Sequence, residues 1–494
     1  MGRLRALGLS AALFPGALIA QNAPAPVALS FSAASERLTR TSPALSGADH
    51  ASTAAREGEA ALKALHRPIV TVSAQYIEYQ KTFSLDVGGV KQAGQEAVTN
   101  YLDTLPDSVA PPFQQVAAEI AARLSQALPG LYAQIPDTLS YRYRADAFRP
   151  TVQAVLPLYS GGAIPAIQRG AEANVALVDA RSAQARDLAQ INLIRLYFGQ
   201  LTAQALVAST KESLTALDSV YSDAVKLEKA GVTPRASTLE AQVARDTAER
   251  AWQRAVLAER SASDDLARTL DADAVVATTA LFVDTRSPMP ASAFLGREGD
   301  LPQTRQADAS RDLARASVDL ARSRYRPQAF AFGEYNLNRN SALPTEPDWV
   351  VGIGARFTIL SNVDRGHSLA AARAQEGAAA DAAREARKQA TSATFRAWNM
   401  MEAARRSFIL LDSSMAAANE NLRVQRISYS EGEATVTAVL GAEAALASAR
   451  SQRAATAYEY VLALAGLLAS SGQLDRFPDY IARANVRLPL EPAR

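Results

Sequence analysis

The chain has 494 residues, with 52 Lys and Arg against 50 Asp and Glu and a net charge of +2. Because charges of both signs are scattered along the chain, electrostatics offers no reason to expect a nucleic-acid partner. Cysteine does not occur, which excludes disulfides and thiolate chemistry, and aromatic residues make up only 6%.

The amino-terminal residues predict a secretory signal over 1–22, with cleavage between residues 20 and 25. Arg3 and Arg5 precede an apolar run over 6–19, and small residues follow that run. No later apolar run approaches the roughly 18 residues that a spanning helix needs. We therefore expect an exported protein that would enter a membrane, if it does so, through strands.

Three strands are predicted from short runs with alternating character. A helix expected over 28–66 precedes the first strand, at 69–87. The second strand is expected at 141–159, with a bulge or register change at Pro150 because proline cannot donate to a ladder. The third is expected at 328–338.

The fourth predicted strand has the clearest alternation. One face carries apolar residues, namely Trp349, Val351, Ile353, Ala355, Phe357 and Ile359. The other face carries small or polar residues. This pattern, with an aromatic residue near one end, is typical of a lipid-facing barrel strand, and an ordinary half-buried strand is the alternative.

The residues between the first two strands form an insertion at about 88–140. It contains Pro111-Pro112 and then apolar residues at helical spacing over 113–128, which predict a short amphipathic helix. A second short helix is possible at 97–105.

Two very long helices are predicted over 165–229 and 363–432, because the first contains no proline after Pro165 and the second contains none. At 1.5 Å per residue each would extend about 100 Å. Apolar residues recur at spacings of three and four, as in a coiled coil. They are Val207, Leu214, Leu217, Tyr221 and Ala224 in the first helix and Phe408, Leu411, Met415, Ala418, Leu422 and Tyr429 in the second.

Much of this order occurs twice. A glycine turn and a returning helix follow each long helix, and the two turns, at Gly231 and Gly432, are separated by about 201 residues. We therefore predict a first structural repeat over 23–270 and a second over 302–470. A connector would occupy 271–301, and a carboxyl-terminal tail 471–494.

This arrangement resembles the TolC-like outer-membrane factor family. The residues that carry the resemblance are Tyr429-Ser430-Glu431-Gly432, Thr435, Val439-Leu440 and Tyr458-Glu459-Tyr460, with Ala230-Gly231-Val232-Thr233, Leu239-Glu240-Ala241-Gln242 and Arg326-Pro327-Gln328. The resemblance implies a trimeric duct of mixed α and transmembrane β structure. A β-barrel of about twelve strands, four per chain, would continue into a long antiparallel α-helical coiled-coil barrel. Physical reasoning agrees, because four strands cannot close a membrane barrel, for which about eight are needed.

The family's function is passage and not reaction, so the resemblance implies no enzyme activity and no cofactor. The protein would be the exit duct of a tripartite efflux pump or a type I secretion system. It would passively conduct substrates from a periplasmic adaptor and an inner-membrane transporter to the cell exterior. The homotrimer would lie in lipid of the outer membrane, with its helical part in the periplasm.

The resemblance also implies site residues. The periplasmic tip, where an adaptor would dock, comprises Gly231, Val232, Thr233, Tyr429, Gly432, Glu433 and Thr435. Residues that would line the aperture are Ser237, Glu240, Ala438 and Gly441. Family members often carry aspartates after the second turn, and this chain has Ala438 and Gly441 there. Glu240 is therefore the best candidate for an acidic ring, with Glu433 and Glu443 behind it. The alternative, that each glutamate faces water on a charged helix surface, is favoured more for Glu443 than for Glu240.

Two other functions were weighed. An enzyme is disfavoured, because His50, His66 and His367 have no ligand-spaced partner and no nucleophile elbow or phosphate loop is present. A coiled-coil scaffold without a pore is the other alternative, and the alternating strand at 349–359 argues against it.

Overall fold

The chain forms two compact units, each of which draws on both predicted repeats. The computed structural model describes residues 27–86, 98, 101–102, 104–105, 108–110, 114–131, 138–338 and 347–488. The helical unit takes its residues from 1–51, 180–305 and 384–494, and the sheet unit takes its residues from 52–179 and 306–383. The predicted signal at 1–22 and part of the predicted insertion lie outside the described residues.

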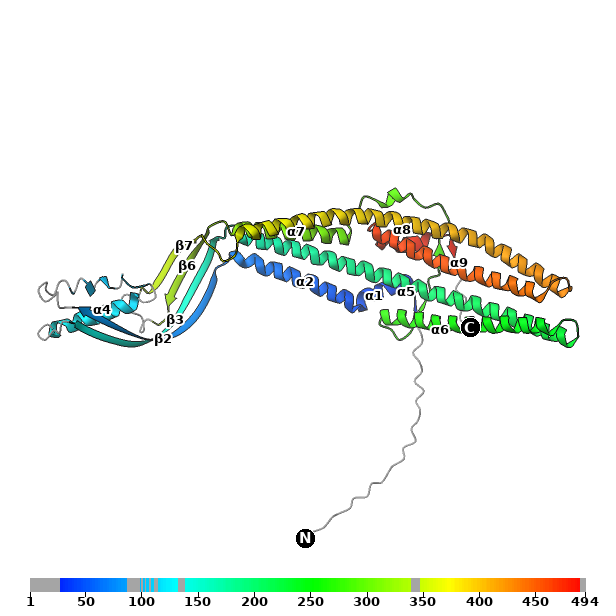
Figure 1. Cartoon of the computed structure of the whole chain (residues 1–494), viewed down its shortest axis with the longest axis horizontal. Helices are drawn as coiled ribbons and strands as arrows, with labels where there is room; N and C mark the ends of the chain where they lie inside the picture. Colours follow the sequence, from blue (N-terminus) through cyan, green and yellow to red (C-terminus); the bar gives the residue numbers. More distant parts are fainter. Residues whose placement is uncertain are drawn as a thin grey trace, which may run out of the picture. The chain divides into compact units, whose positions relative to one another are not determined.

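Four strands of the sheet unit form one antiparallel sheet in the order β2-β3-β6-β7 (Figure 1). Their bounds are Ile69–Asp86 for β2, Thr138–Tyr159 for β3, Gln328–Asn336 for β6 and Trp349–Arg356 for β7. Helix α2 (Pro43–Lys63) precedes β2, α7 (Pro302–Ser323) precedes β6, and α4 (Gln114–Leu131) lies between β2 and β3. The strands therefore occur near all four predicted positions.

The predicted bulge at Pro150 is wrong. Pro150 pairs with Ala74 without a shift in register, and its carbonyl accepts a hydrogen bond from the Leu337 amide at 2.9 Å. The proline nitrogen points to the same side as that carbonyl, just beyond the end of β6, where no ladder partner needs a donor. The register of β3 against β6 shifts instead between Pro157 and Tyr159.

Two glycines of β7 make room for aromatic rings of β6. A Cβ at Gly352 would lie 2.8 Å from the ring of Phe332, and one at Gly354 would lie 2.6 Å from the ring of Phe330. The rings therefore cover β7, and side chains at these two positions would displace them.

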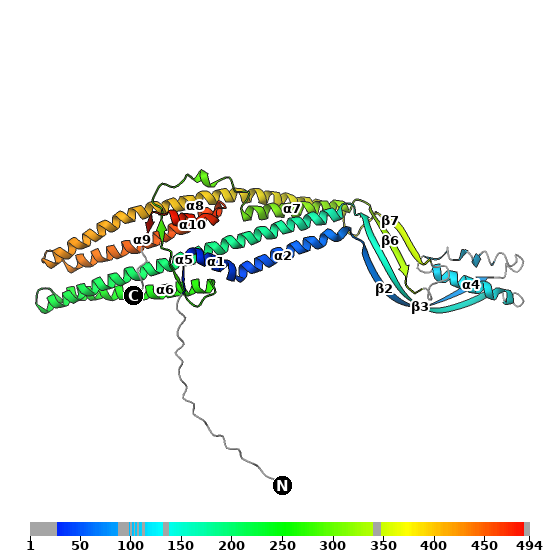
Figure 2. The same cartoon turned by 180° about the vertical axis from the view of Figure 1, so that it is seen from behind.

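Two long hairpins make up most of the helical unit (Figure 2). The first joins α5 (Ala163–Lys229) to α6 (Arg235–Thr269), and the second joins α8 (Arg365–Ser430) to α9 (Val436–Ser470). The first residues of α5 and α8 belong to the sheet unit. Among the described residues, no helix has both the length and the apolarity that crossing a membrane requires.

The single helix expected over 28–66 is interrupted. It comprises β1 (Val27–Leu29), α1 (Phe31–Thr41), α2 and a short turn of 3-10 helix, η1 (Ala64–His66). The break falls at Ser42, whose backbone is extended, because the residue before a proline is disfavoured in helical conformation.

The predicted connector at 271–301 contains strands that the sequence does not predict. Strand β4 (Val275–Ala277) pairs in parallel with β1, and β5 (Phe282–Val283) pairs with β8 (Val486–Arg487). A short 3-10 helix, η4 (Ala291–Phe294), follows, and α10 (Phe477–Arg483) precedes β8.

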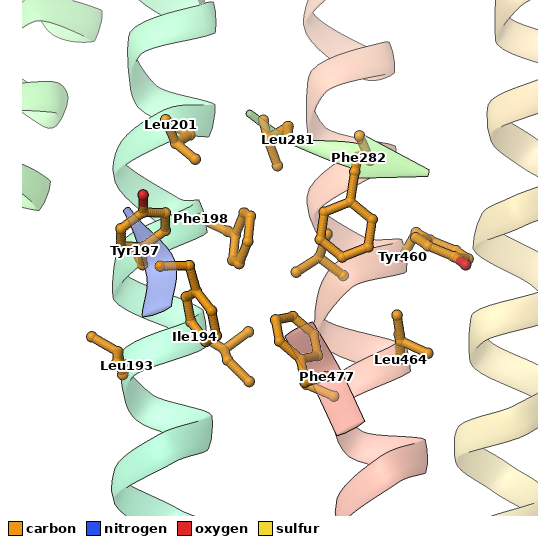
Figure 3. Packing of buried hydrophobic residues seen from close by; sticks show 14 of the residues in the cluster. Leu193, Ile194, Tyr197, Phe198, Leu201, Leu281, Phe282, Tyr460, Leu464 and Phe477 are labelled. Atoms are coloured by element: carbon orange, nitrogen blue, oxygen red, sulfur yellow. The ribbon is translucent and has the colours of Figure 1, made fainter. Parts of the chain in front are cut away.

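An aromatic cluster forms the main core of the helical unit (Figure 3). Phe198 makes edge-to-face contacts with Phe282 and Phe477 at centroid distances of 5.6 and 6.0 Å, and Phe31 contacts Phe477 at 5.2 Å. Each such pair contributes about 0.5–1.5 kcal/mol beyond the area that it buries. The cluster therefore joins α1, α5, the connector and α10.

A second, smaller core lies among the four hairpin helices. Its buried residues are Val220, Ala224, Ala241, Leu422, Val436, Val439, Ala442 and Leu446. Three of the eight are alanines, which allow the helix backbones to approach closely. Of the predicted seam residues, Leu217, Ala224, Phe408 and Leu422 are buried.

Candidate functional site

The two hairpins of the helical unit end in the same kind of turn. Gly231 has φ +75° and Gly432 has φ +81°, a backbone conformation that favours glycine. The Val232 amide donates to the Leu227 carbonyl at 2.9 Å, and the Glu433 amide donates to the Ser428 carbonyl at 2.8 Å. These bonds satisfy carbonyls that a helix end would leave unpaired, as in a Schellman motif.

The predicted tip residues lie at these turns and differ in accessibility. Val232 is 68% exposed, and Glu433 and the two glycines are also exposed. Thr435 caps α9, since its hydroxyl accepts a hydrogen bond from the Ala438 amide at 3.3 Å. Thr233 is half-buried. The first turn thus exposes an apolar side chain, Val232, and the second exposes a carboxylate, Glu433.

Tyr429 lies one turn before the second glycine and is half-buried. Its hydroxyl is enclosed and has no hydrogen-bond partner among the residues that the structure describes. Burial raises the pKa of Tyr429, and the negative charge of Asp223 raises this pKa further. The hydroxyl therefore stays protonated in the physiological pH range and retains its donor.

Ion pairs join the helices within each hairpin. Arg245 of α6 contacts Asp218 of α5 at 2.9 Å, and Arg453 of α9 contacts Asp412 of α8 at 2.7 Å. Exposed pairs of this kind contribute little each, about 0.2–1 kcal/mol.

Polar contacts cross from one hairpin to the other. Thr437 of α9 donates to Glu240 of α6 at 2.8 Å, and Arg450 of α9 is paired with Glu212 of α5. The Tyr458 hydroxyl of α9 also donates to the Arg195 carbonyl of α5 at 3.0 Å. The structure therefore brings the candidate aperture residue Glu240 against the second hairpin.

The other aperture candidates are less polar. Ser237 and Ala438 are half-buried, and Gly441 is exposed. The expectation that Glu443 faces water is wrong, because it is 4% exposed and paired with Arg426 of the facing helix. A carboxylate buried at this depth requires such a partner. Glu240 is the exposed carboxylate of the two.

A cavity of about 640 Å³ lies between α5 and the second hairpin. Its lining mixes charged, hydroxyl and apolar groups: Lys211, Glu212, Thr215, Ala216, Ser219, Val220, Asp223, Arg426, Tyr429, Ser430 and Val439. Among the described residues, no group of three or more His, Asp or Glu side chains could hold a metal ion. The three histidines are exposed and distant from one another in sequence.

The predicted lipid-facing residues are all strongly exposed. Trp349, Val351, Ile353 and Phe357 have between 55% and 77% of their surface accessible, although Phe357 lies just beyond the end of β7. Gly352 and Gly354, on the opposite face of β7, are covered by the rings of Phe332 and Phe330.

Sequence reasoning did not find the buried polar groups that hold the connector. The Tyr197 hydroxyl donates to the Leu29 carbonyl at 2.8 Å and accepts from the amides of Thr278 and Thr279 at 3.0 and 2.9 Å. One turn later the Gln200 amide group, which is fully buried, binds the backbone of β4 at both ends. These residues sit on a long helix with no local signal of their role.

A second missed group is a buried ion cluster on α8. Glu402 is 9% exposed on its side chain and contacts Arg405 at 2.7 Å and Arg406 at 2.6 Å. The hydrogen bond from Arg405 is the main reason that the pKa of Glu402 falls to about 2. Arg405 also donates to the Thr285 carbonyl at 2.7 Å, so the cluster fastens the connector to α8.

Comparison with known proteins supports the resemblance seen in the sequence. Residues 300–473 match the outer membrane efflux protein family. No curated protein matches the chain.

Several solved structures share the fold. The Campylobacter jejuni CmeC outer membrane channel superposes with a TM-score of 0.70 at 12% identity, over 90% of this chain and 86% of that chain. The outer membrane protein VceC of Vibrio cholerae gives 0.69 at 14% identity, over 90% and 96%. The open state of the Neisseria gonorrhoeae MtrE outer membrane channel gives 0.68 at 15% identity, over 90% and 89%. The family match over residues 300–473 and the fold shared with these channels confirm the resemblance to the TolC-like outer-membrane factor family.

Proposed function

We propose that this protein is an outer-membrane exit duct that conducts substrates passively out of the cell. The observation that carries the proposal is the combination of one apolar-faced sheet with two helical hairpins, in the fold of solved outer membrane channels. This function requires no catalytic residues, because conduction needs a lined channel and not a reacting group.

The sheet supports assembly with further copies. Within the described residues its edge strands are β2 and β7, and an open edge in lipid would leave backbone groups without partners. These two strands run in opposite directions, so β7 of one copy beside β2 of the next would continue the antiparallel order. Three copies would supply about twelve strands, enough to close a barrel. Such head-to-tail contacts close into a ring.

The helical unit suits the periplasmic part of such a duct. The turns at Gly231 and Gly432 expose Val232 and Glu433, which we assign to the surface that docks a periplasmic adaptor. Glu240, exposed beside the second hairpin, is assigned to the aperture, where a ring of three carboxylates would favour cations. An inner-membrane transporter would supply the energy, in a tripartite pump or a type I secretion system.

The test is electron microscopy of the mature protein extracted from outer membranes in detergent, together with conductance in planar bilayers. The proposal expects threefold particles with a long helical part and a stable conductance. Compact monomers recovered from the soluble periplasmic fraction would refute it and would favour a scaffold without a pore.

A further inference from the structure

One face of the sheet is apolar across all four strands. Backbone register places Val72, Val152, Tyr335 and Trp349 in one row across the sheet, and the next row contains Val70 and Val351. Val72 is 71% exposed. We call this surface the apolar face. The opposite face is mixed, with the rings of Phe330 and Phe332 and also polar groups such as the Ser73 and Thr151 hydroxyls, which are hydrogen-bonded at 2.9 Å.

The apolar face ends abruptly along β2 and β3. Tyr76 pairs with Phe148, and both are exposed. The next pair on the same face is Glu78 with Asp146, and the one after it contains Arg144. Arg144 lies 3.9 Å from Glu78, and both side chains are more than 60% exposed. Exposed charges on a lipid-facing surface are costly in the hydrocarbon region and tolerated at its edge.

The other two strands end near the same level. The last pair of β6 with β3 is Asn336 with Thr151, and β7 begins at Trp349. Strands β2 and β3 continue alone as a two-stranded ribbon, from the pair of Ala74 with Pro150 to that of Asp86 with Thr138. At about 3.4 Å per residue, the part from Glu78 onward is roughly 25–30 Å long.

We infer that the lipid-contacting band ends at the Tyr76–Phe148 pair and that the ribbon of β2 and β3 projects from the membrane into water outside the cell. The aromatic pair would lie at the interface, where such residues are enriched. The inference rests on the proposed function, which puts the helices on the periplasmic side. The ribbon leaves the sheet at the end opposite to α2 and α7 (Figure 1).

The ribbon therefore carries α4 away from the lipid. Helix α4 has its own covered apolar side, with Ala117 and Ile120 fully buried and Leu124 nearly so. Leu102, from the segment before it, is also buried. A helix with a covered apolar side needs no lipid to complete its packing.

The absence of cysteine from the chain makes the test direct, because single-cysteine variants of the full protein carry one reactive group. Gln80→Cys and Arg142→Cys place the thiol on the ribbon, and Val72→Cys is the matched control on the same face of β2. A membrane-impermeant maleimide applied to intact cells should label both ribbon variants at least about tenfold faster than Val72→Cys. Maleimides react with the thiolate, and a thiol ionises readily in water but not in contact with lipid. In proteoliposomes, a bimane on Val72→Cys should be quenched by brominated acyl chains, and one on Gln80→Cys should not.

The possible outcomes distinguish failure of this inference from failure of the proposed function. Quenching at both residue 72 and residue 80 would extend the lipid band past the aromatic pair and overturn the inference while leaving the duct intact. Labelling of the ribbon variants only after cell lysis would also overturn it. Rapid labelling of Val72→Cys without quenching would mean that the sheet is not in lipid, and the proposed function would fail.

Discussion

Replacing Glu402 by Gln should loosen the connector of the helical unit. The Glu402 carboxylate holds Arg405, and Arg405 holds the Thr285 carbonyl. A pKa lowered from 4.5 to about 2 corresponds to about 3 kcal/mol, at 1.36 kcal/mol for each pH unit. Arg406 is 72% exposed and screened by water. We therefore expect the variant to lose about 2 kcal/mol, which is a roughly 30-fold change in a local opening equilibrium.

Amide hydrogen exchange of the purified protein, followed by mass spectrometry, measures this opening directly. Peptides covering 284–290 should lose about 30-fold in protection at pH 7 in the variant. Glu420→Gln is the matched control, because Glu420 pairs with Arg423 on the same helix at the same spacing but its side chain is 60% exposed. In this control variant, the protection of the peptides covering 284–290 should be unchanged.

Acid should have the same effect on the unmodified protein. Because the pKa of Glu402 is lowered in the folded state, its stabilisation is present above about pH 4.5 and is lost as the pH falls toward about 2. Protection of the connector should decline more through this window in the unmodified protein than in the variant, where the remaining decline comes from Asp284, whose pKa is lowered mainly by its hydrogen bond from Arg286. Equal protection in the two proteins at pH 7, or an equal decline in both, would refute the reasoning.

Three further results are expected. Gly231→Ala should destabilise the first hairpin by about 1–2 kcal/mol because of its positive φ, whereas Gly441→Ala, inside α9 with open space around it, should stabilise by about 0.5–1 kcal/mol; thermal unfolding compares the two. Under the proposed function, Glu240→Gln should reduce cation preference in bilayer conductance, and unchanged reversal potentials would remove Glu240 from the aperture. Gly354→Ala should weaken the sheet by about 1–3 kcal/mol through its clash with Phe330, and adding Phe330→Ala should restore part of the loss.

Long regular elements were predictable because their signals are local and repeated. The absence of proline over 166–229 and the alternation after Trp349 each specify an element without knowledge of its neighbours. The break before Pro43 also had a local signal, in the proline itself, which the expectation of one continuous helix overlooked.

Features that depend on distant partners were not predictable. Strand β4 has only three residues and exists because β1, far away in sequence, lies beside it. The burial of Glu443 follows from Arg426 on the facing helix, and a charged residue on one helix gives no sign of such a partner. Tyr197 and Gln200 likewise give no local sign of their role, because their polar groups bind backbone amides of the distant connector.

Under the proposed function, the aromatic cluster has a consequence for how the chain folds after export. Phe477 lies among Phe31, Phe198 and Phe282, and β8 pairs with β5 close by. The innermost core of the helical unit thus joins residues from opposite ends of the described chain. If the chain crosses a membrane from its amino terminus, the rings of Phe31 and Phe198 stay exposed to water until Phe477, some 280 residues after Phe198, has also crossed. Contacts between residues so far apart in sequence form late in folding. A partly exported chain would therefore expose apolar rings, and periplasmic chaperones would find their substrate there.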